Sequence, residues 1–231
     1  MARKVNPISL RLGLTQVWNL TIQNYGKLNY CYMSSFLQYW RTRNIIAKIL
    51  KFNKFLINDK ELWYINNTLF LNIYMVDLVK KHSDMYLFLI KELSKLVCKW
   101  FSLKVDLRIY KRISWMTTSN LMLSYVSYLF DENRNLNKIL WQVCTFLKKH
   151  LHKGKVVYST KGIRIAYLKG FKIRLVGRFD NTKSQMAKSI QQGSGSLSLL
   201  SLKNQVEYMQ KNLHTKLGSC GLQIWLFYEI N

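Results

Sequence analysis

Every charged residue between Lys148 and Arg178 is a lysine or an arginine, and no acidic side chain interrupts this basic tract. Its cations are Lys148, Lys149, Lys153, Lys155, Lys161, Arg164, Lys169, Lys172, Arg174 and Arg178. Such a segment repels itself when it is compacted without a counter-charge, whereas a merely solvated face usually carries both signs of charge. The tract therefore favours a fold that presents these cations to a polyanion.

The whole chain has the same bias, with 36 lysines and arginines against 11 acidic residues and a net charge of +25. Apolar residues make up 49% of it and aromatic residues 14%, which indicates a folded protein with a basic exterior. The most apolar runs, Leu69 to Val79 and Met85 to Phe101, are interrupted by charged or amide side chains. We therefore expect polyphosphate as the partner and no membrane span.

Alternation in the basic tract predicts how its cations are displayed. In a strand that begins at Phe171, the apolar residues Phe171, Ile173 and Leu175 point inward, so Lys172 and Arg174 share the opposite face. Cations spaced in this way can follow a phosphate backbone. RNA is favoured over DNA because no helix-turn-helix, zinc-finger or basic-zipper pattern is visible.

The periodicity of apolar residues predicts an α/β or α+β protein of two small domains. Helices are expected over 34–51, 89–100, 119–130 and 136–151, and strands over 63–79 (with a turn at 66–67), 105–110, 162–165, 170–175 and 222–227. Lys169-Gly170 is predicted to turn a hairpin, and Gln191 to Ser196 to form a flexible loop. Residues 1–28 are expected to form an extended basic arm. Most tryptophans, Trp100 and Trp225 among them, are expected in the core.

No pattern in the sequence indicates catalysis, a metal or a cofactor. The only adjacent carboxylates, Asp131 and Glu132, lie at a predicted helix break. The four cysteines and four histidines lack metal-ligand spacing, which favours buried thiols in a reducing compartment. Gly193-Ser194-Gly195 has no phosphate-loop context around it. We therefore expect no catalytic residue, no metal and no cofactor.

Three segments resemble the small-subunit ribosomal protein S-three family. Residues 3–13 read RKVNPISLRLG and are followed by Trp18, similar to the opening of that family. Residues 169–179 read KGFKIRLVGRF, which looks like its characteristic strand and turn. The family's ending is matched by residues 197–226, with Glu207-Tyr208, His214-Thr215, Gly218, Gly221 and Trp225 in order. The middle of the chain resembles the family only in its pattern.

The resemblance implies a basic arm over 1–28, a degenerate type II KH-like domain over 29–113 and a C-terminal α/β domain over 114–231. It also implies ribosomal RNA as partner, in the subunit head near the site where messenger RNA enters, with messenger RNA and other head proteins as neighbours. The residues expected to bind RNA are Arg3, Lys4, Arg11, Lys138, Lys148, Lys149, Lys153, Lys155, Lys161, Arg164, Lys169, Lys172, Arg174, Arg178, Lys183, Lys188, Lys203, His214 and Lys216.

Two departures from the family pattern bear on function. The loop that should carry a GxxG motif reads Lys80-Lys81-His82-Ser83-Asp84, without a glycine, so we expect the KH-like domain to serve as a scaffold only. In the helix expected to face the messenger, Arg134 and Lys138 correspond to family cations, but Ile139 and Gln142 stand where charges are expected.

The sequence favours a mitochondrial member of the family. Its Asn-, Lys-, Ile- and Tyr-rich composition is typical of an AT-rich gene, and its N-terminus shows no targeting segment, so we expect an organelle-encoded protein of the mitochondrial matrix. The alternative is an RNA-binding assembly or splicing factor that uses the same basic face off the ribosome. Stoichiometry separates the two, because a constituent is present once per subunit.

Overall fold

The structure, a computed structural model, describes residues 5–17, 29–53, 55–65, 68–77, 83–101, 104–111, 118–132, 135–178, 186–215 and 217–230. The chain divides into two compact units. The first comprises residues 19–113, and the second combines residues 1–18 with residues 114–231. The chain thus passes from one unit to the other after Trp18 and again after Ile113.

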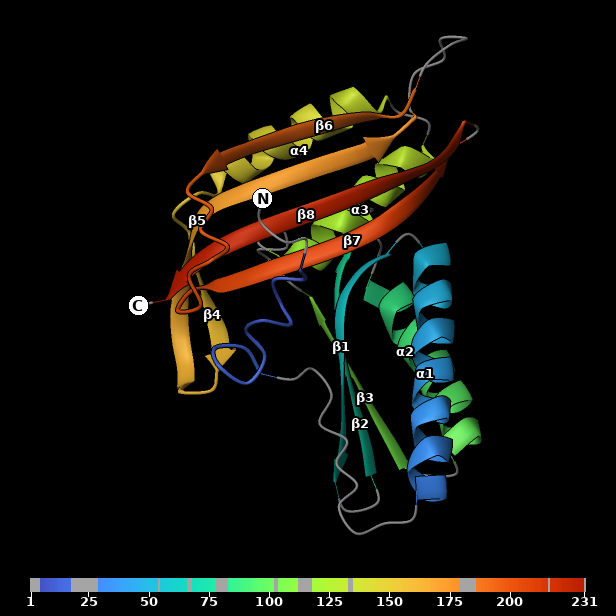
Figure 1. Cartoon of the computed structure of the whole chain (residues 1–231). Helices are drawn as coiled ribbons and strands as arrows, with labels where there is room; N and C mark the ends of the chain where they lie inside the picture. Colours follow the sequence, from blue (N-terminus) through green and yellow to red (C-terminus); the bar gives the residue numbers. More distant parts are fainter. Residues whose placement is uncertain are drawn as a thin grey trace. The chain divides into compact units, whose positions relative to one another are not determined.

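The unit of residues 19–113 is a three-stranded sheet with two helices. Its elements are α1 (Asn29–Phe52), β1 (Phe55–Ile65), β2 (Thr68–Asp77), α2 (Ser83–Phe101) and β3 (Lys104–Lys111). The strand order is β1-β2-β3, with β1 antiparallel and β3 parallel to β2. Figure 1 shows both helices on one side of this sheet, where Ile46 and Leu50 of α1 and Leu93 and Val97 of α2 reach its core.

Predictions in this unit agree with the structure in kind and differ in length. The predicted helices 34–51 and 89–100 lie within α1 and α2, and the predicted strand 105–110 lies within β3. The strand prediction over 63–79 misses most of β1, which already begins at Phe55. The predicted turn at Asn66-Asn67 lies outside the described residues.

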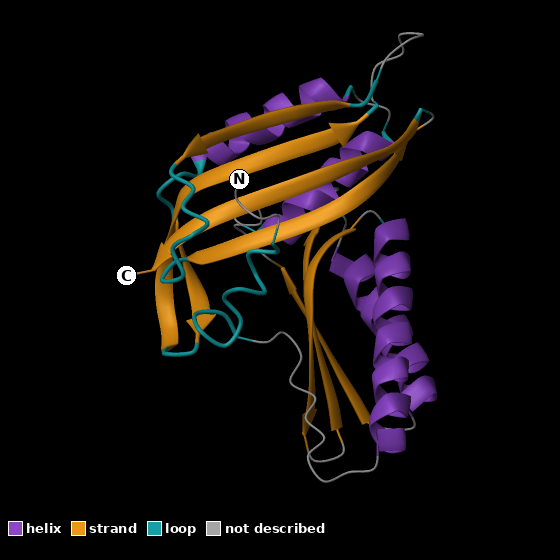
Figure 2. Ribbon diagram, viewed as in Figure 1, coloured by secondary structure: helices purple, strands orange, loops and turns teal. Residues whose placement is uncertain are grey.

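The larger unit packs two helices on one face of a five-stranded sheet. Its elements are α3 (Ser119–Asp131), α4 (Leu136–Lys149), β4 (Gly154–Ser159), β5 (Gly162–Gly177), β6 (Lys188–Gly195), β7 (Gln205–Thr215) and β8 (Gly218–Ile230). The strand order is β4-β5-β8-β7, all antiparallel, and β6 pairs with β5 beyond the end of β4. Figure 2 shows α3 and α4 behind this sheet, whose other face, here called the open face, points toward the viewer.

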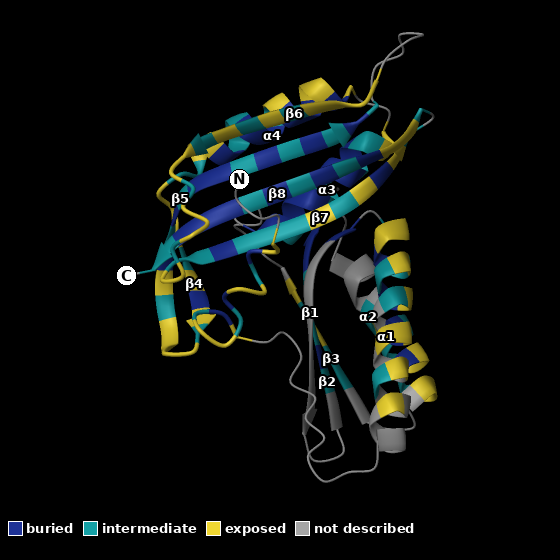
Figure 3. Ribbon diagram, in the orientation of Figure 1, coloured by how far each residue is buried: buried dark blue, intermediate teal, exposed yellow. Residues whose placement is uncertain are grey.

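The core of this unit follows the periodicity of its sequence. Leu136, Ile139, Leu140, Val143 and Leu147 are all buried, which confirms the predicted stripe on α4. They pack against alternate residues of the central strands, and Figure 3 shows buried residues alternating with half-buried ones along β5 and β8. The α+β class is therefore the one predicted.

The predicted hairpin turn at Lys169-Gly170 is wrong, because β5 runs without interruption from Gly162 to Gly177. Its pairing with β8 shifts by one residue between Leu168 and Gly170, which marks a β-bulge. The extra residue in the bulge shifts the alternation of side chains by one position. Leu168 and Phe171, three residues apart, therefore both reach the core under the helices. The hairpin turn lies earlier in the chain, between Ser159 of β4 and Gly162 of β5.

The bulge also inverts the alternation before it. In the predicted strand 162–165 the isoleucines are not buried, since Ile163 is 70% and Ile165 51% exposed. They pair across the hairpin with Tyr158 and Val156, which are exposed as well. This face of the β4–β5 hairpin is thus an apolar surface, and Arg164 points to the opposite side.

The sheet contains two strands, β6 and β7, that the sequence did not predict. The predicted loop Gln191 to Ser196 is mostly strand, because β6 covers Lys188 to Gly195 and pairs with the second half of β5. β7 was not predicted, and it lies at the edge of the sheet beside β8. No residue of β6 is buried, and the strand consists mostly of glycines and polar residues. Its sequence therefore lacks the alternating apolar residues by which a strand is predicted.

The described part of the predicted extended arm, residues 5–17, is a series of turns held on the larger unit. Gln16 donates from Nε2 to the carbonyl of Val206 at 2.8 Å, and Thr160 of the β4–β5 turn donates to the carbonyl of Leu14 at 2.6 Å. Val206 and its neighbour Phe227 on β8 are buried although they lie on the open face. The N-terminal segment therefore covers the end of this face where β7 begins.

Candidate nucleic-acid interface

The predicted RNA-binding cations fall into three groups by exposure. Lys138, Lys148, Lys149, Lys153, Lys161, Lys188, Lys203 and His214 are exposed; Lys155, Arg164, Lys169, Lys172, Arg174 and Arg178 are half-buried; and Arg11 is buried. Arg3, Lys4, Lys183 and Lys216 lie outside the described residues. The basic tract thus contains four exposed and six half-buried cations, distributed over the end of α4, the β4–β5 hairpin and the second half of β5.

Arg11 is held inside the chain and is not presented at the surface. Its side chain has no exposed area, and its guanidinium donates to the carbonyls of Pro7, Leu199, Ser201 and Asn204 at 2.7–2.9 Å. Burial lowers the pKa of Arg11 from its usual value. Its hydrogen bonds fix the N-terminal segment to the loop before β7, so Arg11 is excluded from the interface described below.

Lys155 is also occupied within the chain. Its Nζ forms an ion pair with Oε1 of Glu207 on β7 and lies 3.8 Å from the centre of the Tyr228 ring. Its side chain is only 12% exposed. Burial, and then the negative charge of Glu207, raise the pKa of Tyr228 well above its usual value. This cluster connects strands of the sheet, and it takes up one of the two acidic residues of β7 and β8.

The other acidic residue, Glu229 of β8, pairs with Lys169 at 2.6 Å. Both side chains are partly exposed, so the pair is worth little in water. Since Glu207 and Glu229 already have partners, neither is the counter-charge of Lys172 or Arg174. Within the described part of the chain, no ion pair is formed by either of these two cations.

The centre of the open face carries cations beside aromatic rings. Lys172 of β5 is directly opposite Trp225 of β8, and its Nζ lies 5.5 Å from the centre of that ring. On the other side of Trp225, Tyr208 of β7 is directly opposite it, with the ring centres 5.2 Å apart and the planes at 38°. Arg174 is opposite Gln223 in the next position of the same face.

Amide side chains fix the tyrosine of this group. Gln223 donates from Nε2 to the hydroxyl of Tyr208 and to Oε1 of Gln210, both at 3.2 Å, and the Tyr208 hydroxyl donates to Gln210 at 2.7 Å. Burial raises the pKa of Tyr208, and the hydrogen bond from Gln223 partly opposes this shift. The Tyr208 hydroxyl is therefore held from its own strand β7, by Gln210, and from β8, by Gln223.

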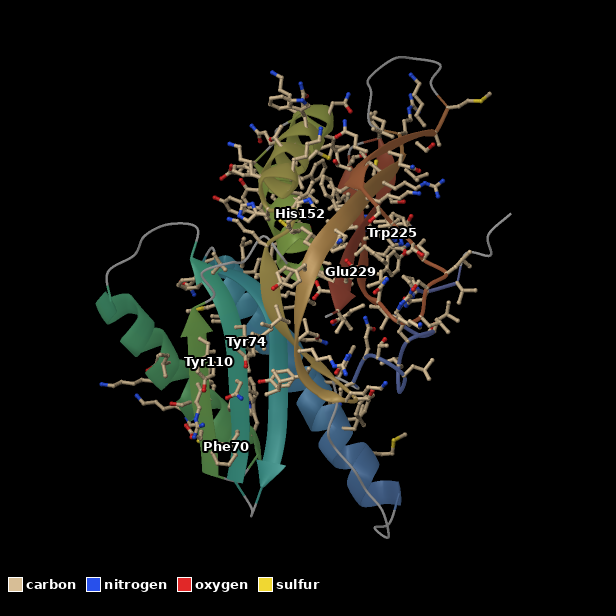
Figure 4. The ribbon with its side chains drawn as sticks, turned by 90° about the vertical axis from the view of Figure 1, so that its left-hand side faces the viewer. Phe70, Tyr74, Tyr110, His152, Trp225 and Glu229 are labelled. Atoms are coloured by element: carbon tan, nitrogen blue, oxygen red, sulfur yellow. The ribbon has the colours of Figure 1, made fainter. Side chains whose placement is uncertain are left out.

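Sequence reasoning missed this group, because Trp225 was expected in the core. Trp225 is half-buried and lies on the open face, while Leu222, Ile224 and Leu226 of the same strand reach the core. The signal was present in the sequence: Trp225 is out of phase with those three residues, so strict alternation places it on the other side. Figure 4 shows Trp225 and Glu229 along β8.

Helix α4 presents an exposed aromatic residue. Trp141 is 65% exposed and lines a shallow hollow with Asn137, Lys138 and Gln142. Ile139 of the same helix is fully buried and belongs to the core. Lys148 and Lys149 stand in the last turn of α4, where their positive charges interact favourably with the negative end of the helix dipole. Arg134 lies outside the described residues.

In the described ranges, no group of three or more His, Cys, Asp or Glu side chains could hold a metal ion. The described helices include none that is long and apolar enough to cross a bilayer.

Comparison with known proteins identifies the family. No family model matches the chain. Among curated proteins, small ribosomal subunit protein uS3m of Chondrus crispus is 42% identical over 99% of this chain and 94% of its own length. Protein uS3 of Carsonella ruddii is 24% identical over 100% of the chain and 99% of its own length, and uS3c of Euglena longa is 25% identical over 98% and 99%.

These relatives share one class, that of small-subunit ribosomal proteins, and the α+β fold with its basic surface agrees with it. At 42% identity over nearly its full length, the chain belongs to the uS3 family, in its mitochondrial form. The membership predicted from three short segments of sequence is thereby confirmed, and the similarity extends through the middle of the chain as well.

Proposed function

We propose that this chain is a structural constituent of the mitochondrial small ribosomal subunit, where it binds ribosomal RNA in the subunit head near the site where messenger RNA enters. The names of its relatives support the ribosomal role, and the mitochondrial relative supports the compartment. A composition typical of an AT-rich gene supports organelle encoding. We also propose that it contacts neighbouring proteins of the subunit head.

The observation that carries RNA binding is the excess of cations in the larger unit. Residues 114–231 contain 17 lysines and arginines and five acidic residues. Glu207 and Glu229 are already paired with Lys155 and Lys169, so the chain has few carboxylates left for its exposed lysines. Phosphodiester groups supply the missing counter-charge, and the release of their counterions drives binding.

The outward side of α4 is the surface we assign to the messenger side. It presents Lys138, Trp141 and the lysines of the last turn, Lys148 and Lys149. Because Ile139 is in the core and Gln142 is uncharged, this surface has fewer cations than the resemblance led us to expect. We therefore assign it contact with RNA and give the larger share of binding to the rest of the basic tract.

The unit of residues 19–113 is proposed to be KH-like. Its element order, helix, two strands, helix and strand, with one antiparallel and one parallel pairing, supports this assignment. The positions where a GxxG loop would be expected lie mostly outside the described residues and contain no glycine. We propose that this unit acts as a scaffold within the subunit.

Sedimentation of gently lysed mitochondria tests the proposal. The protein is expected to migrate with the small subunit, once per subunit, and to leave it as salt is raised. Recovery only as free protein, or in clearly substoichiometric amounts, would reject a constituent role. The second of these outcomes would favour the assembly or splicing factor.

Salt dependence tests the interface. The triple variant Lys148→Gln, Lys149→Gln, Lys153→Gln should weaken binding to small-subunit RNA and lower the log–log salt slope by about 2–3, at about 0.7–0.9 for each contact. A matched control removes three exposed lysines of α2 through Lys91→Gln, Lys95→Gln and Lys99→Gln. Equal losses in the two variants would show that only net charge matters and would refute the assigned surface.

A further inference from the structure

We propose that the open face of the larger unit binds an unpaired stretch of RNA by stacking a base on Trp225. This inference rests on the proposed RNA-binding function and names the form of RNA that this face takes. Trp225 stands on β8 between Lys172 of β5 and Tyr208 of β7, so cationic and aromatic surface lie side by side on three neighbouring strands.

The charges of this face match a nucleic-acid strand. Lys172 and Arg174 stand two residues apart on β5 and point to the same side of the sheet, where a phosphate backbone can pass both. Around them on this face are the amides Gln191 and Gln223 and the glycine Gly193. The one acidic residue of the face among the described strands, Glu229, lies at its far end and is paired with Lys169.

The aromatic rings supply the second half of the recognition. Bases stack on exposed aromatic rings, and stacking requires a base that is not already paired in a duplex. The Tyr208 and Trp225 rings lie 5.2 Å apart, and Tyr208 is fixed by its hydrogen bonds to Gln210 and Gln223. The platform is therefore arranged before the RNA arrives. The amide groups beside it can bond to base edges.

The described part of the N-terminal segment, residues 5–17, leaves the centre of the face partly exposed. It covers the end at Val206 and Phe227, which are buried, whereas Tyr208 and Trp225, two residues away on the same strands and face, keep part of their surface. The covered end and the open centre thus lie along the same two strands. A single-stranded segment is thin enough to lie on the open centre.

The other unit offers an internal comparison. Its sheet also carries aromatic side chains, with Tyr74 and Tyr110 stacked at 5.4 Å and Arg108 over the Phe70 ring at 5.1 Å (Figure 4). There, however, Arg108 forms an ion pair with Asp106 at 2.7 Å. That cation is neutralised within the chain, so we do not expect this second aromatic group to bind RNA in the same way.

Binding of the full-length protein to a single-stranded oligonucleotide and to a duplex of the same length tests the inference. Trp225→Leu should weaken single-strand binding roughly ten-fold, as expected for one lost base stack, with an unchanged salt slope and unchanged duplex binding. Trp225→Phe should retain binding within about three-fold because it keeps a ring. Lys172→Gln should lower the salt slope by about 0.7, the value for one contact with a single strand.

Tyr110→Leu in the other unit is the matched control and should leave both RNAs bound as in the wild type. The inference is overturned if Trp225→Leu weakens single-strand and duplex binding equally, or neither. It is also overturned if Trp225→Leu binds RNA normally but fails to join small subunits, since the face would then hold a protein. Failure of the proposed function looks different, because the wild-type protein would then bind no RNA.

Discussion

Oε2 of Glu207 accepts a hydrogen bond of 3.0 Å from the backbone N–H of Ser119, the first residue of α3. The residue before it, Thr118, makes no side-chain capping bond, so a carboxylate from β7 serves as the cap of this helix. The same carboxylate pairs through Oε1 with Lys155 of β4. One acidic side chain thereby joins a helix to two strands, and it can be tested directly.

Glu207→Gln should lower the free energy of unfolding by about 1–3 kcal/mol, because it leaves the ammonium of Lys155 nearly buried without an anion. Urea unfolding measures the loss. Lys155→Met should lower the free energy of unfolding by less, because the carboxylate of Glu207 still accepts the Ser119 N–H and is partly exposed to water. Equal stabilities of wild type and Glu207→Gln would show that the negative charge of Glu207 contributes nothing to stability.

Arg11→Ala should destabilise the larger unit by about 2–4 kcal/mol, because it removes all hydrogen bonds from Arg11 to its four acceptor carbonyls. Hydrogen exchange should show lost protection in residues 5–17 and at the start of β7. Arg41→Ala, at an exposed position of α1, is the control and should change stability by less than about 0.5 kcal/mol. Similar small effects of both variants would contradict the anchoring role of Arg11.

Gly170→Ala should destabilise the sheet by about 1–3 kcal/mol through overpacking. A Cβ at position 170 would lie 2.2 Å from the carbonyl oxygen of Ser196, which is backbone and cannot easily move. At Gly221 on β8 the nearest atoms would be 3.9 Å away, so Gly221→Ala should be tolerated. Thermal unfolding of the two variants gives the comparison, and a Gly170→Ala protein as stable as Gly221→Ala would argue against the close approach at the bulge.

The thiols of Cys144 and Cys220 should react slowly with iodoacetamide in the folded protein. Burial raises the pKa of both, and for Cys220 hydrogen bonds with Thr215 and the Arg178 backbone only partly oppose it. With a raised folded pKa, the unfolded thiol ionises first, so these groups cost stability as the pH rises above about 8.5–9. Mass spectrometry should find both labelled later than Cys98, which is partly exposed. Labelling of all three at one rate would contradict this prediction.

The sequence was sufficient where structure depends on local spacing. The apolar stripe of α4 and the alternation after Phe171 predicted a buried helix face and an outward pair, Lys172 and Arg174, and both are found. The sequence was insufficient where one extra residue reverses which side chains face the core, as at the bulge between Leu168 and Gly170. The bulge is fixed by pairing with Phe227 and Tyr228 of β8, 57 to 60 positions later, and leaves no periodic trace of its own.

Prediction of the candidate interface was limited for a similar reason. A cation in a sequence cannot be assigned to RNA or to the chain itself until its neighbours are known. Lys155 and Arg11 belonged to the predicted RNA-binding set, but their partners stand 52 and up to 193 positions away. Tryptophan is usually buried, so its residue type alone predicts a core position for Trp225. Its place in the alternation of β8, between the core residues Ile224 and Leu226, puts it on the open face.

The hydrogen bonds of Arg11 have a consequence for how the protein is made. Its acceptors at Leu199 and Asn204 are 188 and 193 positions downstream, so a nascent chain carries this arginine without them during almost the whole of translation. The N-terminal segment can settle only once that late loop has left the exit tunnel. Any product that terminates before this point should therefore have a loose beginning as well as a missing end.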